Sequence, residues 1–181
     1  DQVAQAMRLS SRVSINLETP TAECLAVIAP KKNADVLFEP LRWIEEIRKS
    51  ADPRDTWNGR WPSSSTQFVV GAAGESDRDL LGMAQRLRRE AGLARVHYST
   101  FEPAEGTPLE QAAPENPLRS FRLYQADFLI RDYGFGAEEL LQGRERLPLH
   151  IDPKLSYARI FLTEAPVEVN RADRRDLLRI P

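Results

Sequence analysis

The segment from Ser65 to Leu87, "STQFVVGAAGESDRDLLGMAQRL", decides the fold because it joins three kinds of local structure in succession. The apolar run 68–70 predicts a buried strand, and a glycine-containing turn follows it. Ser76 and Asp79 resemble a capping box, which predicts that a helix begins there, and Gly92 suits its end. One face of this helix would be apolar, with Leu80, Ala84, Leu87 and Ala91.

The same order of strand and helix occurs on both sides of this segment. Upstream, Val13, Ile15 and Leu17 alternate with polar residues as in a strand, and a helix with an apolar face of Leu37, Leu41, Ile44 and Ile47 is predicted to begin near Pro40. The segment 51–65 is predicted to be a loop. Downstream, "LARVHYSTF" predicts a third strand and "PLRSFRLYQADFLIRDYGF" a third helix that ends at Gly134.

Three successive strand-helix units predict an α/β fold with a parallel sheet, because parallel strands need helical crossovers. An open doubly wound sheet and part of a barrel both satisfy this pattern. The first strand favours the barrel, since Ser14, Asn16 and Glu18 place a polar row on one face, whereas a fully buried parallel strand is apolar on both faces. A barrel lumen that holds a polar ligand accommodates such a row. The second half of a barrel is therefore expected over residues 1–134.

Two further segments follow the predicted barrel half. Residues 135–166 break into short pieces and are expected to connect irregularly, with short helices. Residues 167–181 are expected to begin a separate small helical module. The first residues read as though they lie within a helix, and we expect the chain to be a piece of a longer protein.

The composition bounds the classes of function. The chain has 181 residues, 41% of them hydrophobic, which is enough for one α/β domain and a small appendage. The formal charge of -2 provides no overall field for nucleic acid or membrane. The single cysteine, Cys24, excludes an internal disulfide framework and a cysteine-rich metal site. Since the chain also has no apolar run of the length of a membrane span, we expect a cytoplasmic protein with no membrane partner.

The turn "GAAGES" is the main candidate site. Gly71 and Gly74 remove side chains where a ligand approaches the backbone, and the amides at the start of the next helix attract anions. However, the turn matches neither common phosphate-binding pattern, and Glu75 places a carboxylate where an anion would bind. A ligand with hydrogen-bond donors, such as a ribose or an amine, fits better. The alternative is an ordinary strand-helix junction, in which the helix dipole alone favours the acidic residue.

The segments "SINLETP", "QFVVGAAGESDRDLL" and "ARVHYSTFEPAEGTPLE" resemble the fourth, fifth and sixth strands of a radical S-adenosylmethionine (radical SAM) barrel, the fifth through its "VGxxGES" pattern. The run through "RLYQADFLIRDYGF" and "DPKLSYA" to "PVEVNRADRRDLLRIP" is similar to the DNA modification or repair family of radical SAM proteins. The resemblance covers nearly the whole chain. It implies the C-terminal portion of a partial (β/α)6 TIM-like barrel with parallel strands, followed by the start of a helix-hairpin-helix.

The resemblance also implies which residues bind S-adenosylmethionine. The polar row of the first strand would face the cofactor, its last two members nearest the ribose or methionine end: Ser14, Asn16 and Glu18. The turn would lie along the adenosine, with the carboxylate orienting it: Gly71, Gly74 and Glu75. Two residues of the third strand would flank the adenine, although a place in the core is the alternative for them: Val96 and Tyr98.

The sequence departs from the radical SAM pattern in one respect that decides the chemistry. These enzymes carry a CxxxCxxC loop whose three thiolates hold a 4Fe-4S cluster, and this chain has one cysteine. The cluster ligands would therefore come from the missing N-terminal half of the barrel. By itself the chain is expected to form part of a cofactor wall and to generate no radical.

The tail "NRADRRDLLRIP" resembles the first helix of a helix-hairpin-helix. Four arginines would then contact DNA phosphates: Arg171, Arg174, Arg175 and Arg179. A solvated amphipathic helix of mixed charge is the alternative. Two hypotheses for function follow: a fragment of a radical SAM enzyme with a DNA-associated role, or a non-catalytic nucleic-acid-binding or assembly module.

Overall fold

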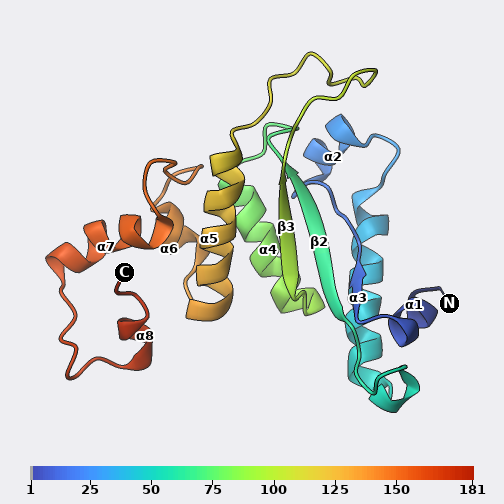
Figure 1. The fold of residues 1–181 in the computed structure, drawn as a ribbon, viewed down its shortest axis with the longest axis horizontal. Helices are drawn as coiled ribbons and strands as arrows, with labels where there is room; N and C mark the ends of the chain where they lie inside the picture. The colour runs from blue at the N-terminus through green and yellow to red at the C-terminus, as the bar shows by residue number, and fades with distance from the viewer. Residues whose placement is uncertain (1) are drawn as a thin grey trace.

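The computed structural model describes residues 2–181 as a mixed α/β structure around a three-stranded parallel sheet (Figure 1). The strands are β1 (Arg12–Ser14), β2 (Ser63–Val70) and β3 (Arg95–Thr100), paired in that order. Ser65 lies opposite both Ser14 and Arg95, which fixes the register of the two ladders. The predicted parallel α/β class is confirmed.

Eight α-helices occur in residues 2–181, together with a short 3-10 helix (Pro53–Asp55). They are α1 (Gln2–Leu9), α2 (Ala22–Ile28), α3 (Ala34–Ser50), α4 (Asp77–Ala91), α5 (Pro117–Tyr133), α6 (Ala137–Leu141), α7 (Pro153–Glu164) and α8 (Arg174–Leu177). None of the helices within this range is long and apolar enough to cross a bilayer.

The helices that follow the strands cover one face of the sheet and leave the other open. Buried residues of α3, α4 and α5 form a single core with Phe68 and Val70 of β2. Neighbouring positions of the strands point to the opposite face, where Ser14, Gln67 and His97 keep contact with solvent. No described helix lies in front of β2 and β3 in the view of Figure 1. The sheet therefore has one apolar, covered face and one polar, uncovered face.

Helix α4 begins and ends as the sequence predicts. The Ser76 hydroxyl accepts a hydrogen bond from the Asp79 N–H (3.1 Å), and the Asp79 carboxylate accepts one from the Ser76 N–H (3.0 Å), which completes the capping box. Gly92 ends the helix in the left-handed region, at φ +55°. The predicted apolar row is buried. These contacts are local, so the sequence alone suffices to predict them.

The two outer edges of the sheet differ. On β3, the Tyr98 N–H that points away from β2 donates to the hydroxyl of Tyr124 on α5 (2.9 Å). On β1, Ile15 N–H donates to Ser65 O, so the peptide groups of Arg12 and Ser14 point away from β2. Within residues 2–181 no strand pairs with them. The outward N–H of Tyr98 on β3 is therefore occupied, whereas the outward peptide groups of β1 are free for pairing.

The first strand is shorter than predicted because a side chain enters its ladder. The Thr66 hydroxyl donates to Ile15 O (2.8 Å) and accepts from Leu17 N–H (3.1 Å). Strand pairing stops after Ser14 and returns as a single bridge between Glu18 and Phe68. Four residue steps on this chain thus match three on β2, which is the count of a β-bulge.

The predicted start of the second helix near Pro40 is wrong. Helix α3 begins at Ala34 and contains Pro40 in its interior, although proline removes one backbone hydrogen bond there. Leu37 and Phe38, which precede the proline, pack against the core. Their burial offsets the lost hydrogen bond. The predicted loop 51–65 is also shorter, since β2 already begins at Ser63.

Candidate functional site

The carboxyl ends of the three strands meet at one edge of the sheet. Glu18 O accepts from Val69 N–H (2.8 Å), and Val70 O accepts from Phe101 N–H (2.9 Å), so the chain leaves β1, β2 and β3 at neighbouring points. The glycine turn follows Val70 directly. This edge therefore brings the polar end of the first strand and the turn together, and it is the candidate site.

The carboxylate of Glu75 holds the turn from within. It accepts hydrogen bonds from the Gly71 N–H (2.5 Å) and the Ala73 N–H (3.2 Å), and it is buried. Among the described contacts, the N–H groups of Ala72 and Gly74 have no acceptor in the protein. Glu75 therefore fixes the shape of the turn by binding two of the turn's backbone amides. The other two, of Ala72 and Gly74, remain available to a ligand.

A buried guanidinium ties the turn to α5. Arg119, which is 2% exposed, donates to Asp77 Oδ1 (2.7 Å), to Glu115 Oε2 (2.7 Å) and to the Glu75 carbonyl oxygen (2.7 Å). Its Nη1 also lies 3.4 Å from the Glu75 carboxylate. Sequence reasoning missed this cluster, because Glu115 precedes α5 and its partners Glu75 and Asp77 lie more than 40 positions from Arg119.

Glu115 lies against the turn and keeps its charge. Burial by itself would raise the pKa of Glu115, but hydrogen bonds from Arg119 and the Asn116 N–H, together with nearby Arg146, leave this pKa below its ordinary value. A methyl group on Gly71 would lie 2.5 Å from Glu115 Cβ, so only glycine fits beside it. With Glu75 and Asp77, three carboxylates surround one buried guanidinium at this edge.

Glu18 holds an unusual backbone conformation at the end of the first strand. Its φ of +69° lies in the left-handed region, which is uncommon for residues other than glycine. Its carboxylate pairs with Lys32 Nζ at 2.7 Å and stays partly exposed. Residues in sparsely populated backbone regions concentrate at functional sites. Lys32, 14 positions from Glu18, was not predicted as its partner.

The other two members of the polar row lie next to each other on the open side. The Ser14 hydroxyl donates to the Asn16 side-chain oxygen (2.9 Å). Ser14 is exposed, and Asn16 is partly buried. Within residues 2–181 the amide N–H groups of Asn16 have no acceptor, so they can donate to a ligand.

The two predicted adenine neighbours lie in the core instead. Val96 and Tyr98 are buried among the helices that cover the sheet. The Tyr98 hydroxyl donates to Asp127 Oδ1 (3.0 Å), and burial, reinforced by that carboxylate, raises the pKa of Tyr98 well above its usual value. Both side chains face away from the open side, so the alternative of a core role is the one that the structure shows.

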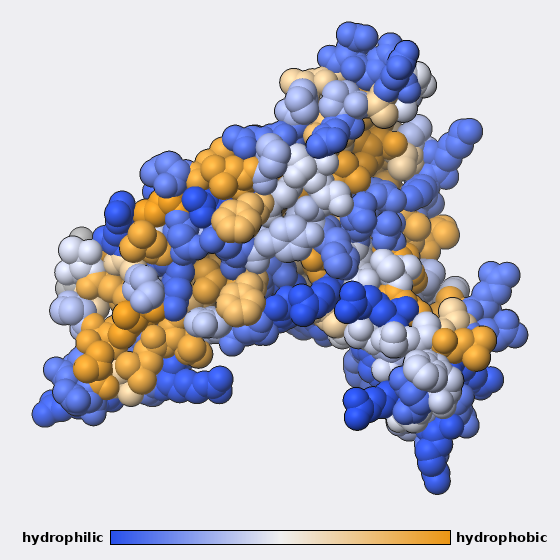
Figure 2. Space-filling view, in the orientation of Figure 1, coloured by the Kyte–Doolittle hydropathy of each residue, from blue (hydrophilic) through white to orange (hydrophobic). Residues whose placement is uncertain are grey.

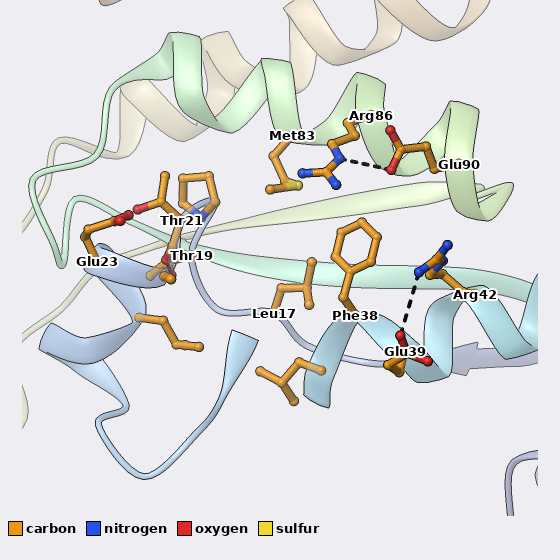
Figure 3. A pocket seen from close by; sticks show the side chains of 14 residues that line it. Leu17, Thr19, Thr21, Glu23, Phe38, Glu39, Arg42, Met83, Arg86 and Glu90 are labelled. Atoms are coloured by element: carbon orange, nitrogen blue, oxygen red, sulfur yellow. Dashed lines mark hydrogen bonds and ion pairs between the residues drawn. The ribbon is translucent and has the colours of Figure 1, made fainter. Parts of the chain in front are cut away.

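A hollow of about 630 Å³ lies on the helix-covered side, between α2, α3 and α4 (Figure 3). Leu17, Phe38 and Met83 form apolar walls. At its rim Arg86 pairs with Glu90 and Arg42 with Glu39. Leu17 and Thr19 line this hollow and Glu18 does not, so the hollow and the polar row lie on different sides of the chain.

The tail places one of its four predicted DNA-binding arginines out of reach. Arg179 is buried, donates to Glu139 Oε1 (2.8 Å) and lies over the Phe135 ring, 4.7 Å from its centre. It holds the end of the chain after α8 against α6, and its Nη1, which has no acceptor among the described residues, is buried away from a phosphate in solution. The remaining three are exposed: Arg171, Arg174 and Arg175.

We expect acid to release this tail. Burial alone would raise the pKa of Glu139. The hydrogen bonds from the Gly136 N–H and from Arg179 lower this pKa by more, so in the folded protein it lies below its ordinary value. The contact therefore stabilises the fold above the unfolded pKa and loses its effect as the pH falls through the folded pKa. Limited proteolysis near residue 165 should accelerate as the pH falls below about 5 and through the folded pKa of Glu139. The variant Glu139→Gln should be cleaved at one rate throughout, and an equal acceleration in both proteins would contradict the assignment.

Within residues 2–181, no group of three or more His, Cys, Asp or Glu side chains is arranged to hold a metal ion. No family model matches this chain, and comparisons with curated proteins and with solved structures give no match either. The assignment of a function therefore depends on the residues and their geometry.

Proposed function

We propose that the chain is the second half of a partial (β/α)6 barrel in a radical SAM enzyme and that it supplies the fourth to sixth strands. Two features support this proposal. The strands are parallel and adjacent, with helices packed on one face, as in the wall of a barrel. The opposite face is polar where a closed barrel would enclose a lumen.

The residues at the carboxyl edge fit S-adenosylmethionine, which carries a positive sulfonium, ribose hydroxyls and an adenine. Glu18 supplies a partly exposed acceptor for the hydroxyls, and Asn16 supplies amide donors. The free amides of Ala72 and Gly74 fit the acceptor atoms of the adenosine. The carboxylates around Arg119 favour a cation nearby. When bound beside a reduced iron-sulfur cluster, S-adenosylmethionine would supply the chemistry of hydrogen abstraction, and the residues of this chain would hold and orient it.

The residues of this chain do not fit the cluster itself. A 4Fe-4S cluster of this kind needs three thiolates, and the chain contains Cys24 alone. The proposal therefore assigns the cluster ligands to the N-terminal half of the intact protein. It assigns to the intact protein a DNA-associated role, in modification or repair.

The backbone of Glu18 carries the proposal, because a left-handed glutamate at a strand end is a strained arrangement that function explains. In the intact protein, Glu18→Ala should weaken binding of S-adenosylmethionine by roughly 10- to 100-fold, as for a lost hydrogen bond to a charged group. Titration calorimetry measures this change.

Glu23→Ala is the matched control, because Glu23 lines the hollow on the covered side. It should leave the affinity unchanged. A loss of affinity in Glu23→Ala, with none in Glu18→Ala, would place the ligand in that hollow and overturn the proposal. Anaerobic preparation of the intact protein tests the chemistry: a brown protein that cleaves the cofactor is expected, whereas a colourless protein that only retains DNA would favour a non-catalytic binding module.

A further inference from the structure

The outer face of α5 exposes a row of aromatic rings. Phe121 is 54% exposed, Tyr124 43% and Phe128 44%. Their spacing of three and four residues places them on one side of the helix. Figure 2 shows hydrophobic surface gathered on this part of the molecule, beside the paler polar centre. Tyr124 also has a structural role, because its hydroxyl accepts the hydrogen bond of the Tyr98 N–H on β3. Phe121 and Phe128 make no such contact with the described residues of β3, so the packing of the helix on the sheet does not explain their exposure.

Positive charges accompany these rings. The Arg122 guanidinium lies 5.8 Å from the centre of the Phe121 ring, and that of Arg131 lies 5.7 Å from the centre of the Phe128 ring. Lys154 Nζ, at the start of α7, lies 4.9 Å from the Tyr133 ring. Arg131 also pairs with acidic neighbours, but within residues 2–181 neither Arg122 nor Lys154 pairs with a carboxylate. Arg122 Nε already donates to Leu149 O (3.0 Å) and its Nη1 to Gln125 Oε1 (2.7 Å). The remaining amino group of Arg122 and the Lys154 ammonium are therefore the donors left for an anion.

A hollow of about 390 Å³ lies between α5 and the start of α7. Tyr124, Phe128 and Tyr133 line it, and the rings of the last two lie 5.3 Å apart. Gln125, Asp152 and Lys154 add polar groups to its wall. The volume is in the range of small-molecule pockets and suffices for one nucleobase.

We propose that the outer face of α5, with Lys154, binds single-stranded DNA. Bases would stack on Phe121 and Phe128, and phosphates would pair with Arg122 and Lys154. Stacked bases and a cationic track are the two elements of sequence-tolerant single-strand binding. Aromatic rings and arginine are also enriched at protein interfaces, but lysine is depleted there, and Lys154 lies at this surface. This surface is separate from the tail, where Arg179 is buried, and the inference does not rest on the cofactor site.

Fluorescence anisotropy with fluorescein-labelled dT20 and the 181-residue chain tests the inference. Phe121→Ala and Phe128→Ala should each weaken binding by roughly 5- to 150-fold, as alanine substitution at stacking positions does. Trp57→Ala is the matched control, because Trp57 is an exposed aromatic residue beside α1, on the β1 side of the sheet. It should bind as the unchanged chain does. Absence of binding at low salt, or equal losses in all three variants, would overturn the inference.

Two further variants distinguish base stacking and phosphate pairing from nonspecific apolar binding. Phe128→Leu keeps an apolar side chain without a ring, so it should lose affinity much as alanine does; full retention would contradict stacking. Arg122→Ala should reduce the slope of log affinity against log salt by about 0.7, as for one phosphate contact to a single strand. An unchanged slope would remove Arg122 from the site. Glu18→Ala should bind dT20 normally, which separates a failure of this inference from a failure of the cofactor proposal.

Discussion

Arg119→Met should lower the free energy of unfolding by about 3–5 kcal/mol, the usual effect of removing one partner from a buried ion pair. The substitution leaves Glu75, Asp77 and Glu115 close together without the guanidinium that joins them. Methionine fills a similar volume, so the loss reflects charge and hydrogen bonds more than a cavity. For a domain of this size, the midpoint of thermal unfolding should fall by about 10 °C or more.

Arg89→Met is the matched control for this prediction. Arg89 is on α4, its side chain is 77% exposed, and it pairs only with the neighbouring Glu90. Its substitution should change the stability by at most about 0.5 kcal/mol. Chemical denaturation of both variants measures the difference. Similar small losses in the two proteins would show that the buried cluster contributes little.

Gly71→Ala should produce the second-largest loss, roughly 3 kcal/mol. The backbone of Gly71 has a φ of +93°, which costs free energy for any residue with a Cβ, and the new methyl group would overlap the side chain of Glu115. Glu115 can move only by weakening its hydrogen bond to Arg119. The two effects therefore act on the same cluster.

Gly74→Ala separates the two effects. Gly74 lies in the same turn at φ +76°, but an added methyl group meets no atom within 4 Å. Only the backbone cost of about 1–2 kcal/mol should remain. If thermal unfolding shows equal losses of stability for the two variants, the contact with Glu115 contributes nothing. Backbone conformation alone then explains why position 71 requires glycine.

Local signals predicted the elements around the turn well. The capping box of Ser76 and Asp79, the ends at Gly92 and Gly134, and the strands on either side of α4 are all confirmed. Each depends on residues within a few positions of one another, and their physical causes act over that range. The parallel sheet follows from the order of these elements alone.

The features that the sequence did not predict depend on contacts between distant segments of the chain. Thr66 interrupts the first strand from 51 positions away, and Arg119 reaches Asp77 across 42 positions. Arg179 reads as a surface cation in its own segment, yet Glu139 and Phe135 enclose it in the fold. No periodicity within one segment encodes such partners. The same holds for Tyr98, whose core position depends on Asp127.

The hydroxyl of Tyr124 favours the addition of a further strand at the β1 edge of the sheet over the β3 edge. It occupies the donor of Tyr98 that a new strand beyond β3 would need, while β1 keeps free peptide groups at Arg12 and Ser14. An endless ribbon of copies joined strand to strand requires two open borders on every molecule. Because the Tyr124 hydroxyl competes for pairing at β3, strand addition is favoured at β1 alone, and we expect the sheet to acquire one neighbour there rather than seed a fibre.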